Sequence, residues 1–92
     1  MNFHFIGWCK EDNHDKVWVS FEFEGSHYVG WGRRNKKLKF KQHYYRPTKL
    51  EYDKQRKGYQ PVDEFMLFTL FPDFKDSVAE SLCLETLAGT VM

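Results

Sequence analysis

A tryptophan between two glycines, followed by a run of cations, is the part of this sequence with the clearest capacity for chemistry. Trp31 is flanked by Gly30 and Gly32, which are expected to bare its indole ring because they carry no side chains. The basic residues that follow are Arg33, Arg34, Lys36, Lys37, Lys39 and Lys41. Aromatic rings stack on nucleotides, and cations hold phosphates without reading the bases. This segment is therefore predicted to bind nucleic acid.

The lysines of this run alternate with apolar residues, as they would on a β-strand. Leu38 and Phe40 are expected to point inward from a strand over 36–41, and the outward residues are then Lys37, Lys39 and Lys41. Side chains on one strand face are about 6.6 to 7 Å apart, close to the spacing of successive phosphates on one nucleic-acid strand. Two plainer interpretations stay open. Trp31 could be a core ring, and the lysines could be a solvated face that prevents edge-to-edge aggregation.

Charge is distributed unevenly along the chain, although the formal net charge is only +1. The stretch 33–57 carries eleven basic and two acidic residues, a net charge of +9, whereas the remainder carries −8. A dipolar chain of this kind attracts a polyanion at one part of its surface and stays in solution. No set of side chains resembles a reader of base edges, so binding should depend strongly on salt and weakly on nucleotide sequence.

Patterns of catalytic or metal-binding residues are not recognisable in the sequence. It contains neither a glycine-rich phosphate loop nor a paired-cysteine motif, and the histidines lie in different expected elements without a known ligand spacing: His4, His14, His27 and His43. Cys9 beside His14 or His27 would form a nucleophile and a base, but no third group is placed to orient them. We therefore expect no enzyme activity, no metal and no cofactor, and ordinary thiols at Cys9 and Cys83.

Length and composition indicate one domain. With 92 residues, of which 41% are hydrophobic, the chain is long enough to bury one core and too short for two. The longest apolar run, 65–70, is far too short to cross a bilayer, and residues 1–6 do not have the pattern of a signal peptide. The expected location is intracellular, either cytoplasmic or associated with the nucleus or nucleoid, without contact to a membrane.

The order of expected elements is strands first and helices later. Alternation predicts strands over 2–9, 16–24, 27–33 and 36–41, joined by a loop over 10–16 and by turns at 25–26 and at Asn35. Thr48 and Glu51 have the spacing of a capping box, which predicts a short helix that stops at Gly58. A short closing strand over 59–63 is expected next, and 64–71 stays ambiguous between helix and strand. An amphipathic helix should cover about 73–88.

One pattern in the sequence points to a known family. Tyr28-Val29-Gly30-Trp31-Gly32-Arg33 ends one expected strand, a lysine-rich strand follows, and Lys57-Gly58-Tyr59 comes later. In these residues the chain resembles the WGR domain, which occurs in DNA-dependent poly(ADP-ribose) polymerases and in assorted bacterial proteins. The resemblance covers roughly 3–59. The family usually has an apolar residue and a glycine after the tripeptide, where this chain has Arg34 and Asn35.

The resemblance implies an α+β fold, with a twisted antiparallel sheet of about four to five strands and one or two helices packed on it. The whole chain, 1–92, would be one such domain. It also implies DNA binding, with Trp31 stacked on a sugar near a DNA end and Arg33 in contact with neighbouring domains or the DNA backbone. Asn35 tolerates positive φ better than other non-glycine residues, so the turn is expected to survive.

Two functions follow from these observations. The first is a non-enzymatic DNA-binding module of low sequence specificity, which holds ends, nicks or backbone. The alternative is an adaptor or regulator of a partner protein, because a chain without the neighbouring domains of the polymerases could use its docking surface on a separate protein. The pattern specifies neither the oligomeric state nor a preference for DNA over RNA.

Overall fold

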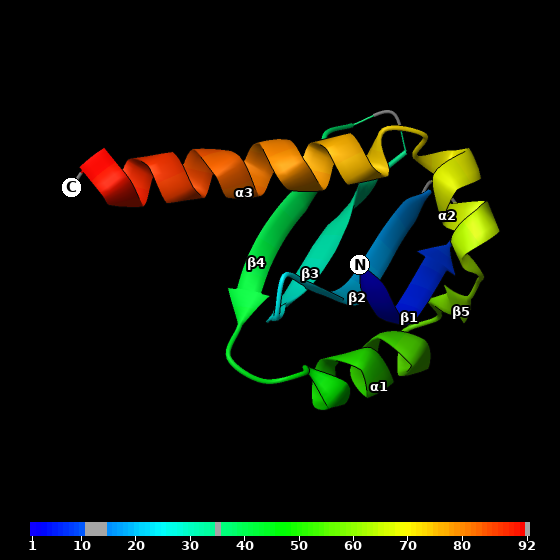
Figure 1. Cartoon of the computed structure of the whole chain (residues 1–92). Helices are drawn as coiled ribbons and strands as arrows, with labels where there is room; N and C mark the ends of the chain where they lie inside the picture. The colour runs from blue at the N-terminus through cyan, green and yellow to red at the C-terminus, as the bar shows by residue number, and fades with distance from the viewer. Residues whose placement is uncertain (11–14, 35, 92) are drawn as a thin grey trace.

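The computed structural model describes residues 1–10, 15–34 and 36–91, with side chains as far as Leu82, and in this part of the chain it shows a five-stranded antiparallel sheet and three helices (Figure 1). In the sheet order β4-β3-β2-β1-β5, the strands are β1 (Asn2–Cys9), β2 (Lys16–Phe23), β3 (Ser26–Arg33), β4 (Lys39–His43) and β5 (Gln60–Pro61). The helices are α1 (Thr48–Arg56), α2 (Glu64–Leu70) and α3 (Phe74–Val91). The predicted α+β class is confirmed.

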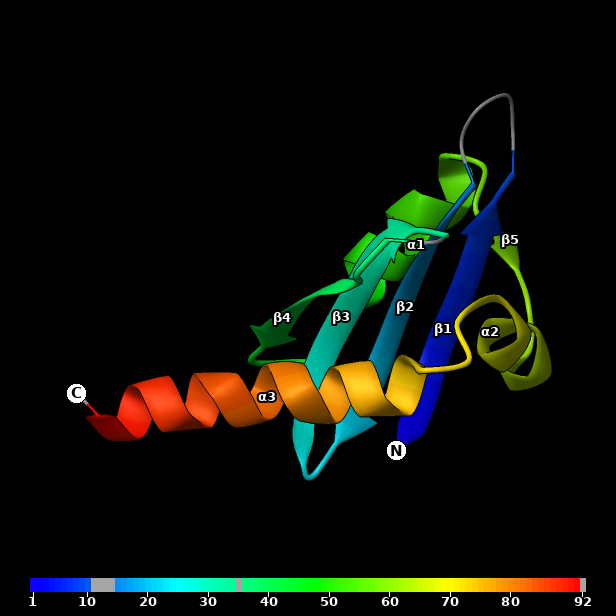
Figure 2. The same cartoon turned by 90° about the horizontal axis from the view of Figure 1, so that it is seen from above.

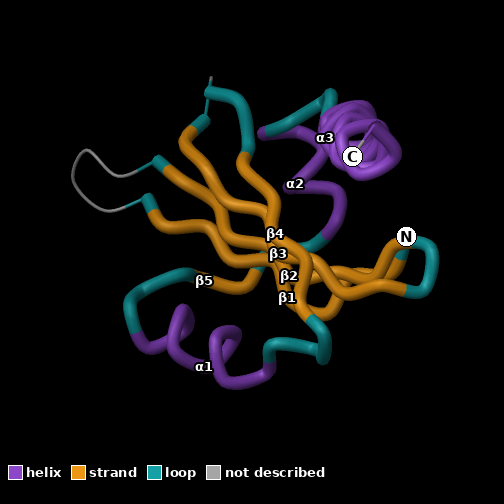
Figure 3. Tube along the Cα trace, turned by 90° about the vertical axis from the view of Figure 1, so that its left-hand side faces the viewer, coloured by secondary structure: helices purple, strands orange, loops and turns teal. Residues whose placement is uncertain are grey.

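The helices are divided between the two faces of the sheet. α1 lies on one face, and α2 and α3 lie on the other (Figure 3). α3 crosses the sheet, and its C-terminal turns extend past the edge strand β4 (Figures 1 and 2). Because side chains alternate along a strand, every strand supplies one set of residues to each face.

β2 and β3 form the central hairpin of the sheet. Val17, Val19 and Phe21 alternate along β2, and all three are fully buried on the face of α2 and α3. At the turn, Glu24 and Gly25 have φ angles of 51° and 80°. Positive φ at both central residues is what a two-residue type I′ hairpin turn requires. Both predicted strands are confirmed, but β2 ends at Phe23 and β3 begins at Ser26, so the turn lies one residue earlier than predicted.

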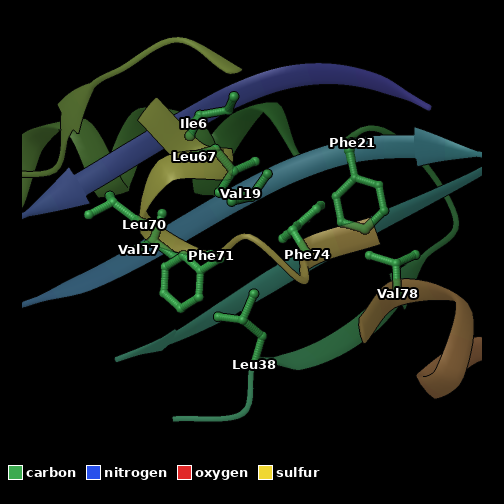
Figure 4. Packing of buried hydrophobic residues seen from close by; sticks show 10 residues of the cluster. All are labelled: Ile6, Val17, Val19, Phe21, Leu38, Leu67, Leu70, Phe71, Phe74 and Val78. Carbon is green, nitrogen blue, oxygen red and sulfur yellow. The ribbon is translucent and has the colours of Figure 1, made fainter. Parts of the chain in front are cut away.

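The main core lies between the sheet and the helices α2 and α3 (Figure 4). Phe21 is at its centre, with ring centroids 5.7 Å from Phe74 and 6.1 Å from Phe40, both in edge-to-face orientation. The buried members of this cluster are Ile6, Val17, Val19, Phe21, Leu38, Leu67, Leu70, Phe71, Phe74 and Val78. Removal of this apolar surface from water is the main source of stability of the fold.

β1 contains a bulge at His4. Phe3 pairs with Phe21 and Phe5 pairs with Ser20, so β1 has one residue more than β2 at this point. The bulge sends Phe3 to the α3 side, where its ring packs on Phe21, and Phe5 to the α1 side. β-bulges re-aim side chains in this way. His4, the inserted residue, approaches His27 of β3, with ring centroids 5.5 Å apart.

The capping box predicted at the start of α1 is wrong, although the helix is present. The N-cap is Pro47, without a side-chain hydrogen bond, because the Glu51 carboxylate binds elsewhere. The predicted stop at Gly58 is confirmed, and Gly58 has a φ of 100°. Its N–H donates to the Gln55 carbonyl, and the Tyr59 N–H donates to the Lys54 carbonyl. These two bonds form a Schellman motif, which turns the chain back toward the sheet.

The segments after α1 complete the fold. The expected closing strand is shorter than predicted, because only Gln60–Pro61 pairs with β1. The ambiguous segment 64–71 forms α2, which begins where the Asp63 carboxylate accepts a hydrogen bond from the Met66 N–H at 2.9 Å. That bond is a standard N-cap. The final helix is longer than predicted and runs over Phe74–Val91.

Some expectations fall outside the described residues. The predicted turn residue Asn35 lies there, and so does most of the expected loop over 10–16. Cys83 lies beyond the described side chains, whereas Cys9 is a buried free thiol. Among the helices that the structure describes, none combines the length and the apolar character needed to cross a membrane.

Candidate nucleic-acid interface

Trp31 lies on the face of the sheet that carries α1. It pairs with Trp18 of β2 on one side and with Lys39 of β4 on the other. Paired residues in neighbouring strands point to the same face, so the Trp31 ring and the Lys39 side chain share one surface. Lys41 belongs to that surface as well, because it pairs with Val29, two residues before Trp31.

The Trp31 ring is half-buried. It packs against a second hydrophobic cluster on the α1 face, which consists of Phe5, Cys9, Trp18, Val29 and Tyr59. Trp18 is a core residue of this cluster at 4% exposure. Trp31 therefore has both an anchor and an accessible surface. A ring held in this way can accept a stacking partner without first being ordered.

Gly30 and Gly32 are not what exposes the Trp31 ring, contrary to the expectation. They alternate with Trp31 along β3 and therefore face the opposite side of the sheet. A Cβ on Gly30 would lie 2.6 Å from Cε1 of Phe40, and a Cβ on Gly32 would lie 2.9 Å from Cδ2 of Leu38. The glycines make room for these two side chains, and this packing holds the lysines of β4 beside Trp31.

Two open hollows meet at Trp31, which lines both together with Arg33. The hollow toward α1 has a volume of about 460 Å³, and its lining includes Trp18, Tyr59 and the cations Lys16, Lys41 and Lys54. The hollow toward the edge of the sheet has a volume of about 440 Å³, and its other charged lining residues are Lys36, Lys37 and Lys39. Among the described residues that line these hollows there is no Asp or Glu.

The cations around the first hollow act on one another. Burial lowers the pKa of Lys54, and the nearby charges of Lys57 and Lys16 lower it further. The Lys54 Nζ lies 5.6 Å from the centre of the Tyr59 ring, where the aromatic face stabilises the ammonium group. Burial in turn raises the pKa of the Tyr59 hydroxyl. An anion in this hollow would relieve the repulsion between the cations.

A buried carboxylate fixes α1 to the sheet. Glu51 is 6% exposed and accepts a hydrogen bond from the Ser20 hydroxyl of β2 at 2.8 Å. Arg46 donates to both carboxylate oxygens, from Nη2 at 2.9 Å and from Nε at 3.2 Å. Bidentate pairs of this kind constrain orientation as well as distance. This network therefore helps to place Leu50 and Lys54 of α1 at the first hollow.

The predicted row of three lysines is only partly present. β4 begins at Lys39 and not at Lys36, so Lys39 and Lys41 share a strand face while Lys37 precedes the strand. The Lys37 Nζ lies 4.0 Å from Oε1 of Glu80 on α3, and its side chain is 95% exposed. An exposed pair at this distance contributes little stability. Lys37 therefore extends from the edge of the sheet toward α3.

Arg34 is the predicted site residue that the structure does not bring to either hollow. Its backbone N–H donates to the Asp15 carbonyl at 2.9 Å, and its Nη1 lies 3.7 Å from the Asp15 carboxylate. The backbone bond extends the β2–β3 pairing by one hydrogen bond. The neighbouring carboxylate partly neutralises the Arg34 charge.

Sequence reasoning missed the part of the site that comes from outside the tryptophan segment. Lys16, Leu50 and Lys54 line the first hollow but were not selected, because they are distant from Trp31 in the sequence. Tyr59, at 8% exposure, closes the cluster below Trp31. The available signal was Gly58, whose turn folds α1 and Tyr59 back onto the sheet.

The chain was compared with models of protein families, with curated proteins and with solved structures. The resemblance to the WGR domain stays a prediction that rests on the motif residues themselves, because none of these comparisons gives a match.

Proposed function

We propose that this domain is a non-enzymatic, WGR-like module that binds the sugar-phosphate backbone of nucleic acid, DNA in the first place, at ends, nicks or single-stranded segments. The observation that carries the proposal is the half-buried Trp31 ring between two hollows, where every charged lining residue that the structure describes is basic. An aromatic platform with cations on both sides is the arrangement by which proteins hold single strands.

The spacing of the cations supports contact with a backbone. Lys39 and Lys41 are two residues apart on one strand face, which separates them by about 6.6 to 7 Å. A nucleotide stacked on Trp31 would have phosphates within reach of these lysines on one side. Arg33 lines both hollows and would contact a phosphate from the end of β3.

The same surface predicts weak sequence preference. Among the described residues that line the hollows, the polar ones are mainly lysine and arginine, which contact phosphate oxygens in most nucleic-acid complexes. Release of counterions then dominates affinity, so the logarithm of the affinity should fall linearly with the logarithm of the salt concentration.

A titration with labelled oligonucleotides tests the proposal. The ligands are a single strand, a blunt duplex, a nicked duplex and a closed circle without ends, each at two salt concentrations. Trp31→Ala should weaken binding by about 5- to 150-fold, the equivalent of about 1 to 3 kcal/mol for the loss of one stacked base. Circular dichroism of the variant checks that the fold is retained.

The matched control is Phe65→Ala, which removes an aromatic ring that is 80% exposed on α2, away from both hollows. This variant should bind like the wild type. Equal affinity of Trp31→Ala and wild type would remove Trp31 from the site. Absence of any binding at the lower salt concentration would overturn the nucleic-acid proposal.

The second candidate function is docking to a partner protein, and one observation favours it. Three tyrosines outside the hollows are strongly exposed in the segment that leads from β4 into α1, namely Tyr44 at 89%, Tyr45 at 76% and Tyr52 at 63%. Exposed tyrosines are enriched in protein interfaces. If the oligonucleotides do not bind, these residues become the surface to test.

A further inference from the structure

Three side chains of metal-binding type meet near the β2–β3 turn, at the opposite end of these strands from Trp31. His4 comes from β1, Glu22 from β2 and His27 from β3. One potential ligand atom of each, an imidazole nitrogen or a carboxylate oxygen, lies within 4.8 Å of those of the other two. Glu22 and His27 are direct cross-strand partners, and His4 reaches them from the bulge of β1.

Each of the two imidazoles has a buried nitrogen that no described protein group satisfies. Nε2 of His4 and Nδ1 of His27 are inaccessible to solvent, and neither has a hydrogen-bond partner among the described residues. A buried polar atom without a partner is costly, so such atoms are rare and call for an explanation. The ring centroids of the two histidines are 5.5 Å apart. A single ion between the rings would satisfy both nitrogens.

We propose that His4, Glu22 and His27 bind one divalent transition-metal ion, with Zn²⁺ as the cation that fits this donor set best. Zinc accepts imidazole nitrogen and carboxylate oxygen at about 2.0 to 2.2 Å, and many sites combine three protein ligands with one open position. The ligand atoms lie within 4.8 Å of one another, so side-chain rotation would have to bring them closer together around the ion. Mg²⁺ and Ca²⁺ prefer sites made of oxygen ligands, so they should bind poorly.

The surrounding charges permit a cation at this place. Besides Glu22 and His27, the charged groups that act on His4 are Arg46 and Glu51. These two form the bidentate ion pair described above, so their charges largely cancel. Glu22 then supplies the negative charge that an incoming cation requires. The site shares no residue with the two hollows around Trp31, so this inference does not depend on the proposed function.

Calorimetry tests the inference. The protein is first treated with a chelator that is then removed, and ZnCl₂ is the titrant. One ion should bind per chain. At a free zinc concentration about one hundred times Kd, Tm should rise by about 10 °C or more. MgCl₂ and CaCl₂ at the same concentration should leave Tm unchanged. Co²⁺ in place of zinc should give a d–d absorption spectrum without a thiolate-to-cobalt band, which excludes cysteine ligands.

Three variants locate the ion. Glu22→Gln keeps the shape of the side chain and should lower zinc affinity at least tenfold, and His27→Ala should lower it about a hundredfold or more. His43→Ala is the matched control, because His43 is the β4 partner of His27 but is not part of the three-residue group. It should bind zinc like the wild type.

Each result of these zinc titrations either supports the proposed site or overturns it. Zinc binding that is weakened in Glu22→Gln and kept in His43→Ala supports the site. No rise of Tm with zinc in the wild-type protein overturns it, and so does a rise of equal size in Glu22→Gln. If His27→Ala does not fold, the conservative Glu22→Gln variant decides alone.

Discussion

The two faces of the sheet differ in how they are held together, although the same strands supply both. The face under α2 and α3 is a continuous cluster of rings and aliphatic side chains, with Phe21, Leu67 and Phe74 fully buried. The buried polar residues that the structure describes, Ser20 and Glu51, both belong to the α1 face. One face is thus specialised for stability. The α1 face combines a small aromatic cluster with charged side chains, and it has open hollows that are available for binding.

The largest expected effect is the difference in stability between variants that remove an aromatic ring from one face or the other. Phe21→Ala should lower the free energy of unfolding by about 3 to 5 kcal/mol, because it empties a fully buried site in the main core. Trp31→Ala removes a half-buried ring from the α1 face and should cost about 1 to 2 kcal/mol. Urea unfolding followed by circular dichroism measures both. An equal loss in the two variants would show that Trp31 is as much a core residue as Phe21.

An intermediate effect is expected at the polar attachment of α1. Glu51→Ala should lower the free energy of unfolding by about 1 to 3 kcal/mol, because it leaves the buried Ser20 hydroxyl without its acceptor and Arg46 without its partner. Adding Ser20→Ala to this variant should cost less than Ser20→Ala does in the wild-type protein. Strict additivity of the two changes would contradict the account of α1 given above.

The smallest effect on stability should accompany a clear effect on binding. Lys41→Ala should change the free energy of unfolding by less than about 0.5 kcal/mol, because the side chain is exposed. It should reduce the slope of log affinity against log salt by about 0.7 for a single strand, as expected for one lost phosphate contact. Lys75→Ala, on α3 at the other face, is the matched control and should leave the slope unchanged. Equal salt slopes for Lys41→Ala and Lys75→Ala would contradict the assignment of the phosphate contact to the α1 face.

Local sequence patterns predicted the elements well wherever one face of a strand is fully buried. Alternation over 16–24 gave β2 nearly to the residue, since each of its inward side chains is at 0% exposure. Gly25 and Gly58 marked their turns because both need positive φ. The start of β4 was placed three residues too early, because Lys37 continues the alternating pattern without pairing to β3.

Most of the incorrect predictions concern residues whose contacts are made with residues far away in the sequence. Glu51 has the spacing of a capping box, but its carboxylate instead binds Ser20, thirty-one residues earlier in the chain. Strand alternation alone turns the glycines beside Trp31 to the opposite face, and the close contact of Gly30 with Phe40 becomes visible only through the β3–β4 register. The group of His4, Glu22 and His27 shows no ligand spacing for the same reason. Three strands and one bulge create it.

Because of the bulge at His4, one residue determines which side chains at the start of β1 face each side of the sheet. After that position β1 sends its odd-numbered residues to the α1 face, and before it Phe3 faces α3. Replacing His4 by another residue would alter only local chemistry. Deleting it would remove the bulge and make Phe3 and Phe5 consecutive residues of a regular strand, so that they would still face their two clusters opposite Phe21 and Ser20. β1 is therefore expected to tolerate the loss of His4 better than the loss of a residue between Phe5 and Cys9, which would turn Phe5 away from the α1 face.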